Sequence, residues 1–450
     1  MQFVRFLWEE NGKIQVYRFN RVLFGVTSSP FLLTATLKTH LRKHSEEFPT
    51  TTECLDRCLY VDDFISGADN VSDAFEISTQ ATSIMSQASM VLRKWTTNDN
   101  TLMQFWTREG FDTQPQVNTI KVLGLSWNPA EDCLILGKQS LVDSLSKNES
   151  TKRFLLRTIG RIFDPLGLLS PFTIRAKFIL QVLWMKKISW DEEIPVDIQK
   201  IWLQWCFEVP DLSELRVPRN VLNLQESTDI LELHCFCDAS QKAYGAAIYA
   251  RVVKDNNIEV NLLVSKSRVT PLRKITLPRL ELLGALLAAR LASKVKKTVD
   301  LKKPSLVFFW TDSKITLYWI KGSTKRWKSF VANRVNEIQS LSDTSAWAHC
   351  PGKQNPADLL SRGVSADILL NSDIWWHGPQ FLREKTDVPV DNNDILISLD
   401  DFSDELKKTD DSNDHSPIAF TIMGDLPKER VTPSYPFSNV GTDFLWTIPL

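Results

Sequence analysis

Two apolar runs that each end at an aspartate constrain the fold of this chain more than any other feature. Residues 231–237 lead into Asp238, and residues 306–311 lead into Asp312. Short apolar runs of this kind are typical of central strands that are buried on both faces. Small residues after Asp238 keep the strand end open, and Ser313 is placed to cap a helix after Asp312. The pattern therefore predicts two buried strands that each present a carboxylate at one end.

A third carboxylate, Glu281, lies in residues 280–290, which have the pattern of a helix. On such a helix Glu281 shares one face with Ala285, Ala288 and Ala292. A stripe of small residues lets a helix approach a sheet closely. We therefore expect Glu281 to point at the strand ends.

A fourth acidic residue, Asp358, follows Asn355-Pro356 at the start of a short predicted helix. Four carboxylates that converge on one point repel each other unless cations lie between them, and two divalent metals ~3.5–4 Å apart are the usual solution for phosphodiester chemistry. The set therefore predicts a metal-dependent phosphodiesterase site. Any one aspartate after a strand can instead be a capping or solvated residue.

The segments that contain these carboxylates resemble the ribonuclease H fold, and specifically its Pao (BEL/Pao) retrotransposon form. The matching segments are Phe236–Ser240, Leu277–Leu282, Trp310–Ser313 and His349–Gly363. The resemblance implies a nuclease that cleaves the RNA strand of RNA–DNA hybrids with two Mg²⁺ ions, for which Mn²⁺ can substitute. It implies that Asp238, Glu281, Asp312 and Asp358 bind the metals, that His349 matches a mobile histidine that assists product release, and that Asn355 contacts nucleic acid.

A basic segment around Trp327 is a further candidate for nucleic-acid binding. Arg326 and Lys328 flank the ring of Trp327. Cations on either side of an aromatic ring suit a phosphate backbone, with the ring making a stacking or sugar contact. The alternative is a solvated helix start with one buried tryptophan.

The N-terminal part resembles a reverse transcriptase. The run Tyr60–Ile65 places Asp62 and Asp63 between apolar stretches, a strand-turn-strand pattern that exposes both carboxylates. The resemblance implies that both bind metal, and that an RNA template and a DNA primer are partners. The residues that it implies for nucleic-acid contacts are Phe24, Gly25, Lys94, Leu123 and Gly124.

Both ends resemble parts of larger domains. The polymerase fingers and a further metal-binding aspartate, which the family carries on an earlier strand, have no counterpart here, so we expect no polymerase activity from this chain. Residues 436–444 resemble the opening of an integrase core, with Asp443 in place of its first catalytic carboxylate. The other expected partners are the remaining polyprotein parts, namely integrase, protease and polymerase fingers.

These patterns predict an α/β and α+β chain of several domains. The expected parts are a partial reverse-transcriptase palm (1–137), a helical thumb or connection (138–227), a ribonuclease H-like mixed sheet flanked by helices (228–365), a linker (366–430) and a truncated integrase core (431–450). Residues 384–415 hold eleven acidic residues and three lysines, a local charge of −8 that leaves +7 on the rest of a chain with a total of −1. We expect this segment to be disordered and the remainder to suit a polyanionic partner.

Three further expectations concern metals, compartment and activity. His40, His44, Cys54 and Cys58 are ligand types that bind zinc, at a spacing atypical of structural zinc modules. Seven scattered cysteines and the absence of a long apolar run favour a cytoplasmic protein without membrane contact, and a virus-like particle or the nucleus are other locations. The alternative to an active nuclease is a decayed, non-catalytic remnant that at most binds nucleic acid.

Overall fold

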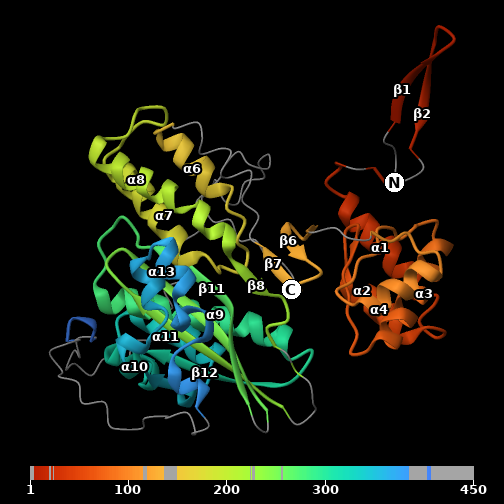
Figure 1. Cartoon of the computed structure of the whole chain (residues 1–450). Helices are drawn as coiled ribbons and strands as arrows, with labels where there is room; N and C mark the ends of the chain where they lie inside the picture. Colours follow the sequence, from red (N-terminus) through yellow and green to blue (C-terminus); the bar gives the residue numbers. More distant parts are fainter. Residues whose placement is uncertain are drawn as a thin grey trace, which may run out of the picture. The chain divides into compact units, whose positions relative to one another are not determined.

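A computed structural model describes residues 5–19, 22–23, 25–114, 119–135, 149–222, 224, 229–254, 257–384 and 403–406. The chain divides into two compact units (Figure 1). The first unit contains residues 1–135 and 216–219, and the second contains residues 136–215 and 220–450.

Within its described residues, the first unit has two small sheets, one short hairpin and four helices. Its strands are β1 (Arg5–Glu10), β2 (Lys13–Arg18), β3 (Leu59–Tyr60), β4 (Asp63–Phe64), β5 (Ile120–Val122), β6 (Leu125–Asn128), β7 (Cys133–Ile135) and β8 (Arg216–Pro218). Its helices are α1 (Ser29–Leu41), α2 (Pro49–Cys58), α3 (Val71–Gln87) and α4 (Asn100–Arg108). β1 pairs with β2, β3 pairs with β4, and β5 to β8 form one sheet in sequence order. The helical core is built around Leu41, Leu55 and Ile84.

The second unit is built on a five-stranded mixed sheet with the order β11-β10-β9-β12-β13. The strands are β9 (Ile230–Ala239), β10 (Ala243–Val253), β11 (Ile258–Val269), β12 (Ser305–Thr311) and β13 (Trp347–His349). β9, β10 and β11 are antiparallel, whereas β12 is parallel to both β9 and β13. Parallel pairing of β9 with β12 brings Cys237 opposite Thr311, so that Asp238 and Asp312 follow at the same edge of the sheet.

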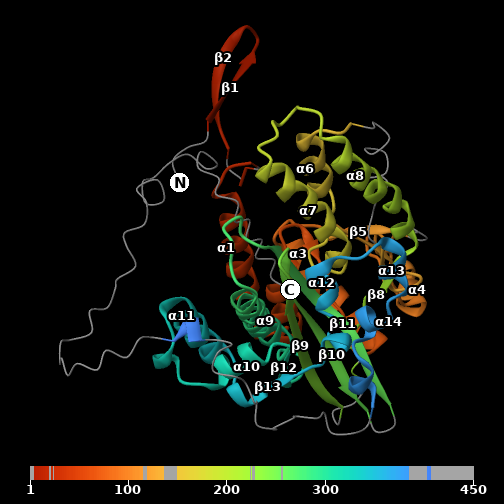
Figure 2. The ribbon, with the colours of Figure 1, turned by 90° about the vertical axis from the view of Figure 1, so that its left-hand side faces the viewer.

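Helix α9 (Leu277–Val299) lies against β9 and β10 (Figure 2). The predicted small-residue face is buried, with Ala285, Ala288 and Ala292 at most 2% exposed. Gly284 allows the closest approach, because a Cβ there would lie 3.1 Å from the backbone oxygen of Asp238. The N-terminal end of α9 is therefore held beside the end of β9, which is where Glu281 lies.

Further helices cover α9 and continue the chain to β13. They are α10 (Lys314–Lys321), η2 (Thr324–Arg326), α11 (Ser329–Leu341) and η3 (Thr344–Ala346). α11 contacts α9, and Val331, Val335 and Ile338 on one face of α11 are fully buried. The apolar face expected of this helix thus completes the core on this side of the sheet.

The segment that precedes the sheet forms helices, one of which packs on the edge strand β11. These are α6 (Lys152–Gly160), α7 (Ser170–Met185), α8 (Val196–Glu208) and η1 (Pro210–Glu214). The turn before α7 contacts β11 directly, since the backbone N–H of Ser265 donates to the oxygen of Leu166 over 2.8 Å. Gly167 has φ +72°, and a Cβ there would lie 2.1 Å from the oxygen of Ser265, so only glycine fits this contact.

Residues 366–384 correct the expected start of the linker. They form α13 (Ala366–Asn371), α14 (Asp373–His377) and η5 (Gln380–Arg383), after η4 (Gly352–Gln354) and α12 (Asp358–Arg362). Trp375 is fully buried, and its Nε1 donates to the oxygen of Leu168 over 3.0 Å. Arg251 on β10 donates to the oxygens of Leu382 and Glu384, over 2.7 and 3.0 Å. Burial of Trp375 and Leu382 explains why this segment packs as part of the second unit.

Within the acidic stretch the structure describes Glu384 and the short helix η7 (Ser403–Glu405) with Leu406. The rest of 384–415, all of 431–450 with Asp443, and Phe24 lie outside the described residues. Among the helices that are described, none combines the length and the apolar character needed to cross a bilayer.

Candidate active site

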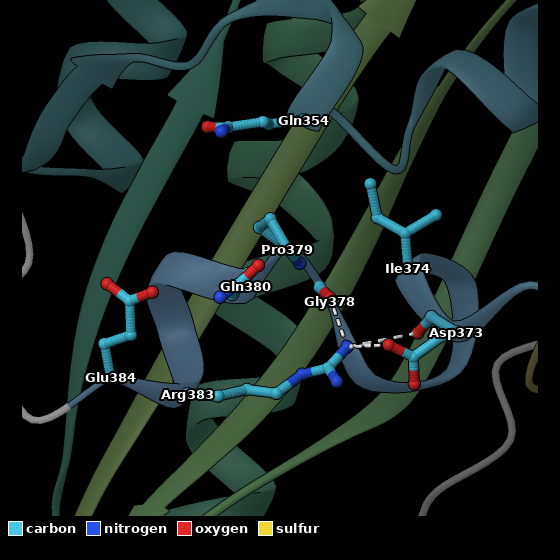
Figure 3. A pocket seen from close by; sticks show the side chains of 8 residues that line it. All are labelled: Gln354, Asp373, Ile374, Gly378, Pro379, Gln380, Arg383 and Glu384. Carbon is cyan, nitrogen blue, oxygen red and sulfur yellow. Dashed lines mark hydrogen bonds and ion pairs between the residues drawn. The ribbon is translucent and has the colours of Figure 1, made fainter.

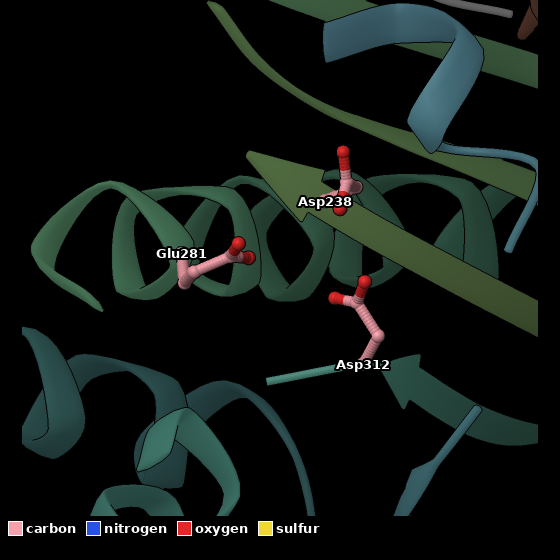
Figure 4. Close-up of side chains that lie close together, drawn as sticks. All are labelled: Asp238, Glu281 and Asp312. Carbon is pink, nitrogen blue, oxygen red and sulfur yellow. The ribbon is translucent and has the colours of Figure 1, made fainter. Parts of the chain in front are cut away.

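Three of the four predicted metal ligands meet at the ends of β9 and β12. One carboxylate oxygen from each of Asp238, Glu281 and Asp312 lies within 4.8 Å of the others. Figure 4 shows Asp238 at the tip of its strand, with the side chains of Glu281 and Asp312 turned toward it. Asp238 and Glu281 are buried and Asp312 is half-buried. Oxygen ligands at this spacing could all contact one cation.

The carboxylates of the cluster lie close together in a largely buried site, which disfavours their charged forms. Burial, reinforced by the neighbouring carboxylates, raises the pKa of Glu281 to about 9. Burial also raises the pKa of Asp238 to about 7, and it raises the pKa of Asp312. Oε2 of Glu281 and Oδ1 of Asp312 are buried without a hydrogen-bond partner. Because buried polar atoms are normally paired, these two oxygens fit a site that binds cations.

The fourth predicted ligand, Asp358, lies next to this triad but is held by another residue. Arg362, four residues later on α12, forms an ion pair with Asp358 through its Nε. The negative charge of Asp358 still contributes to raising the pKa of Asp238 and of Asp312. The structure therefore places Asp358 at the rim of the triad, half-buried and paired.

Ser361 is a site residue that the sequence analysis missed. Its buried hydroxyl donates to Oδ2 of Asp238. This hydrogen bond favours the charged form of Asp238 and fixes the orientation of the carboxylate. The available signal was its spacing, since Ser361 follows Asp358 by three residues and thus lies one helical turn away on α12.

The loop after β13 brings His349 and Asn355 to the same end of the sheet. His349 is half-buried opposite Thr311, and its charge acts on Asp312 to lower the pKa of that carboxyl. Asn355 is 3% exposed; its Nδ2 donates to the oxygen of Cys237 over 2.9 Å, and its Oδ1 accepts from Ala357 N over 3.1 Å. The Nδ2 of Asn355 thus attaches this loop to β9 and its Oδ1 holds the loop itself, so burial corrects its expected role as a nucleic-acid contact.

The residues of the basic segment around Trp327 differ in exposure. Arg326 and Lys328 are exposed, whereas Trp327 is fully buried and packs against the rings of Tyr318 and Trp319. Trp327 is therefore a core residue and cannot stack on a base. Burial corrects this part of the prediction and leaves the two cations available at the surface.

In the first unit the pair Asp62 and Asp63 lies on the predicted tight hairpin. β3 and β4 pair through Tyr60 and Asp63, Val61 in the turn has φ +57°, and both carboxylates are exposed. Within the described ranges, neither aspartate joins a group of three or more His, Cys, Asp or Glu residues at metal-binding distance.

The other residues expected at the polymerase site occupy turns of the first unit. Gly25 and Gly124 have φ +81° and +85°, and Leu123 precedes Gly124 in the turn between β5 and β6 with φ +50°. Lys94 is exposed, with φ +60°. Gly25, expected to contact nucleic acid, has open space around it, since a Cβ there would meet no atom within 4 Å.

The four candidate zinc ligands do not form a metal site. The Nε2 atom of His40 lies 2.7 Å from the oxygen of Ile84, and Cys54 Sγ lies 2.9 Å from Ser66 Oγ. Among the residues that the structure describes, no three of the four ligands come within 4.8 Å of one another. The side chains of His40 and Cys54 are used in these hydrogen bonds instead.

A surface hollow of about 580 Å³ lies apart from the carboxylates (Figure 3). Its lining residues are Gln354, Asp373, Ile374, Gly378, Pro379, Gln380, Arg383 and Glu384. Arg383 pairs with Asp373 across 2.7 Å and donates to the oxygen of Gly378. None of the predicted site residues lines this hollow, so it is not the candidate active site.

The mixed sheet, with acidic residues at the ends of β9 and β12 and on α9, defines the ribonuclease H-like class. Residues 151–313 match the family described as "Pao retrotransposon-like RNaseH-like domain". This match confirms the resemblance to Pao elements, and it includes Asp238, Glu281 and Asp312 but ends before Asp358. It also includes α7, which packs on β11, and the helices α6 and α8, which pack on α7.

Searches of known proteins add little to this family match. No curated protein matches the chain. Twelve chains of solved structures match it. One of them is a foamy viral protease-reverse transcriptase in complex with dsDNA, with 15% identity and a TM-score of 0.21, covering 80% of this chain and 65% of that chain. A superposition at that level adds nothing to the fold assignment.

Proposed function

We propose that the second unit is a ribonuclease H that cleaves the RNA strand of RNA–DNA hybrids with two Mg²⁺ ions. The observation that carries this proposal is the convergence of Asp238, Glu281 and Asp312, two of which have buried oxygens without a partner. When bound, the ions would supply an activated water and stabilise the leaving oxygen of the cleaved phosphodiester.

The residues of the chain have distinct parts in this proposal. Asp238, Glu281 and Asp312 would hold the ions, and Asp358 would join them after release from Arg362. Ser361 orients Asp238, and Gly352 admits the loop close to Asp312, since a Cβ there would lie 3.0 Å from Oδ2 of Asp312. His349 lies next to Thr311 at the same end of the sheet, a position suited to a role in product release.

The test is cleavage of a labelled RNA–DNA hybrid by the purified chain in Mg²⁺, beside an Asp238→Asn variant. We expect RNA-strand cleavage that falls more than about 100-fold in the variant, because even residues that only orient metal ligands are commonly worth 10–100-fold. Duplex DNA of the same sequence should remain intact. No cleavage by the unmodified chain, or equal cleavage by both, would favour the alternative of a non-catalytic remnant.

We further propose that the hairpin with Asp62 and Asp63 is the carboxylate turn of a reverse-transcriptase palm. The support is its geometry, a two-residue turn that leaves both carboxylates exposed between paired strands. Binding of a labelled primer–template, compared between the unmodified chain and an Asp62→Lys variant, tests whether this turn faces nucleic acid. A lysine there should change the affinity if it does, and have no effect if it does not.

A further inference from the structure

A group of cations surrounds the start of α9 and the segment between α10 and α11. Lys325, Arg326 and Lys328 are exposed, and Arg326 lies over the ring of Tyr318 at 5.9 Å. On α9, Arg279 stands over the ring of Phe330 at 4.7 Å, two residues before the site carboxylate Glu281. We call Arg279, Arg326 and Lys328 the basic surface.

A short piece of the acidic segment lies on this surface. The carboxylate of Glu405 accepts two hydrogen bonds from Arg279, over 2.6 Å from Nε and 3.0 Å from Nη2. Glu405 is buried, with its side chain 9% exposed, and that of Arg279 is 32% exposed. The guanidinium of Arg279 in the basic surface is therefore already paired with a carboxylate of the acidic segment.

Backbone contacts fix the position of this piece. Lys328 N donates to the oxygen of Glu405 over 2.9 Å, and Lys328 Nζ donates to the oxygen of Asp404. Trp327 and Leu406 form an antiparallel bridge, and Leu406 packs against the core of the second unit. The four described residues of this piece thus contact two cations of the basic surface, Arg279 and Lys328, and are held by one apolar anchor.

The geometry of the contact is one that a phosphate can reproduce. Guanidinium groups form the same paired hydrogen bonds with carboxylates as with phosphates. Arg279 remains partly exposed beside the buried Glu405, and an ion pair with one exposed partner contributes about 1 kcal/mol, so a ligand with many phosphates can displace a single carboxylate. Tethering nevertheless keeps the acidic segment at a high effective concentration, which makes it a persistent competitor.

We propose that Asp404, Glu405 and Leu406 act as a phosphate mimic on the basic surface, and that a nucleic-acid strand binds this surface by displacing them. The inference rests on the proposed function for the identity of the ligand. It adds that the acidic segment lowers the affinity of the same chain for nucleic acid. Charge supports it, because the segment 384–415 carries −8 against +7 on the remaining chain.

The experiment measures binding of a fluorescent RNA–DNA hybrid to the full 450-residue chain. Divalent metal is omitted so that cleavage does not interfere. Glu405→Gln should tighten binding roughly two- to fivefold, the size expected from losing one partly exposed ion pair. Arg279→Gln should weaken binding, and adding Glu405→Gln to Arg279→Gln should bring no further gain. Thermal unfolding followed by circular dichroism checks that each variant is folded.

Asp191→Asn is the matched control. Asp191 forms a similar two-bond pair with Arg153 on α6, away from the basic surface, and its substitution removes the same unit of charge. An equal gain in Glu405→Gln and Asp191→Asn would overturn the inference, since it would reflect total charge alone. Unchanged or weaker binding in Glu405→Gln would also overturn it.

The inference and the proposed function fail separately. Cleavage in Mg²⁺ with no effect of Glu405→Gln on binding would remove the inference and leave the nuclease. A gain in binding without cleavage would leave the phosphate mimic and remove the nuclease. No binding of hybrid by any variant, together with no cleavage in Mg²⁺, would overturn both.

Discussion

At the scale of single residues, the hydroxyl of Ser361 is the contact with the clearest consequence. Removing it by Ser361→Ala leaves Asp238 without its donor, so the carboxylate loses its fixed orientation. We expect Mg²⁺ affinity and hydrolysis to fall about 10–100-fold, the usual effect of a residue that orients a metal ligand. Isothermal titration with Mg²⁺ measures the loss independently of activity, and unchanged affinity would contradict the assigned role.

The raised pKa values of the triad predict how stability depends on pH. With pKa values of about 7 for Asp238 and about 9 for Glu281, against ordinary values of 3.8 and 4.5, the folded chain binds more protons than the unfolded chain across this range. Stability without metal should therefore fall as the pH rises from about 5 to about 9. Mg²⁺ binds the ionised carboxylates, so its stabilising effect should be larger at the higher pH.

Thermal unfolding with and without Mg²⁺ checks this prediction. A change of about 1 kcal/mol shifts the Tm by about 2–4 °C in a domain of this size. In Glu281→Gln the fall in Tm with rising pH should be smaller, because a carboxyl whose pKa is raised to about 9 is gone. A Tm that rises over this range in the absence of metal would show that the triad does not control stability.

The sequence predicted the charged residues of the site better than their contacts. Asp238, Asp312 and Glu281 could be placed because a strand end and a helix face follow from local patterns. The roles of Trp327 and Asn355 could not, because burial depends on packing between distant segments. The pairing of Arg279 with Glu405 joins residues 126 positions apart and had no local signal.

At the scale of elements, the short helix α12 depends on Gly245 in β10. A Cβ at this position would lie 2.6 Å from Cβ of Leu360 and 3.1 Å from the oxygen of Lys266. Gly245→Ala should therefore displace α12, with Asp358 and Ser361, and destabilise the unit by about 1–3 kcal/mol. Urea unfolding measures the stability and Mg²⁺ titration measures the site.

Gly160→Ala in α6 is the control for this substitution. A Cβ at Gly160 would meet no atom within 4 Å, and alanine favours a helix over glycine by up to about 1 kcal/mol. Unchanged or slightly higher stability is expected there. Equal effects of the two substitutions would mean that the contact of Gly245 with α12 does not constrain the site.

The mixed sheet of the second unit was predictable from the sequence, whereas the C-terminal boundary of the unit was not. The order of strand and helix signals from Leu231 to Asp312 indicates the mixed sheet and its crossover helix, and the structure confirms this fold class. The helices α13 and α14 are short, and their buried residues, such as Leu369 and Trp375, show no clear period. Sequence patterns therefore gave no reason to continue the packed unit beyond residue 365.

At the scale of the whole molecule, residues 366–384 pack against both the mixed sheet and the segment that precedes it in the second unit. Trp375 is fully buried and contacts both Leu168 and Tyr249 through hydrogen bonds. Trp375→Ala should lower the free energy of unfolding of the second unit by about 3–5 kcal/mol. Phe207→Ala, at a side chain that is 78% exposed, should change it by less than about 0.5 kcal/mol. Similar losses in urea unfolding would contradict the packing described here.

The turn at Leu166 and Gly167 has one more consequence, for self-association. A strand at the border of a sheet offers unpaired backbone groups to any other chain. On the outer side of β11, the backbone N–H of Ser265 donates to the oxygen of Leu166. The backbone oxygen of Val260 lies 3.1 Å from the ring nitrogen Nδ1 of His377. If this turn detached from β11, the strand would expose unpaired backbone groups to other chains. We expect such a chain to form fibre-like aggregates.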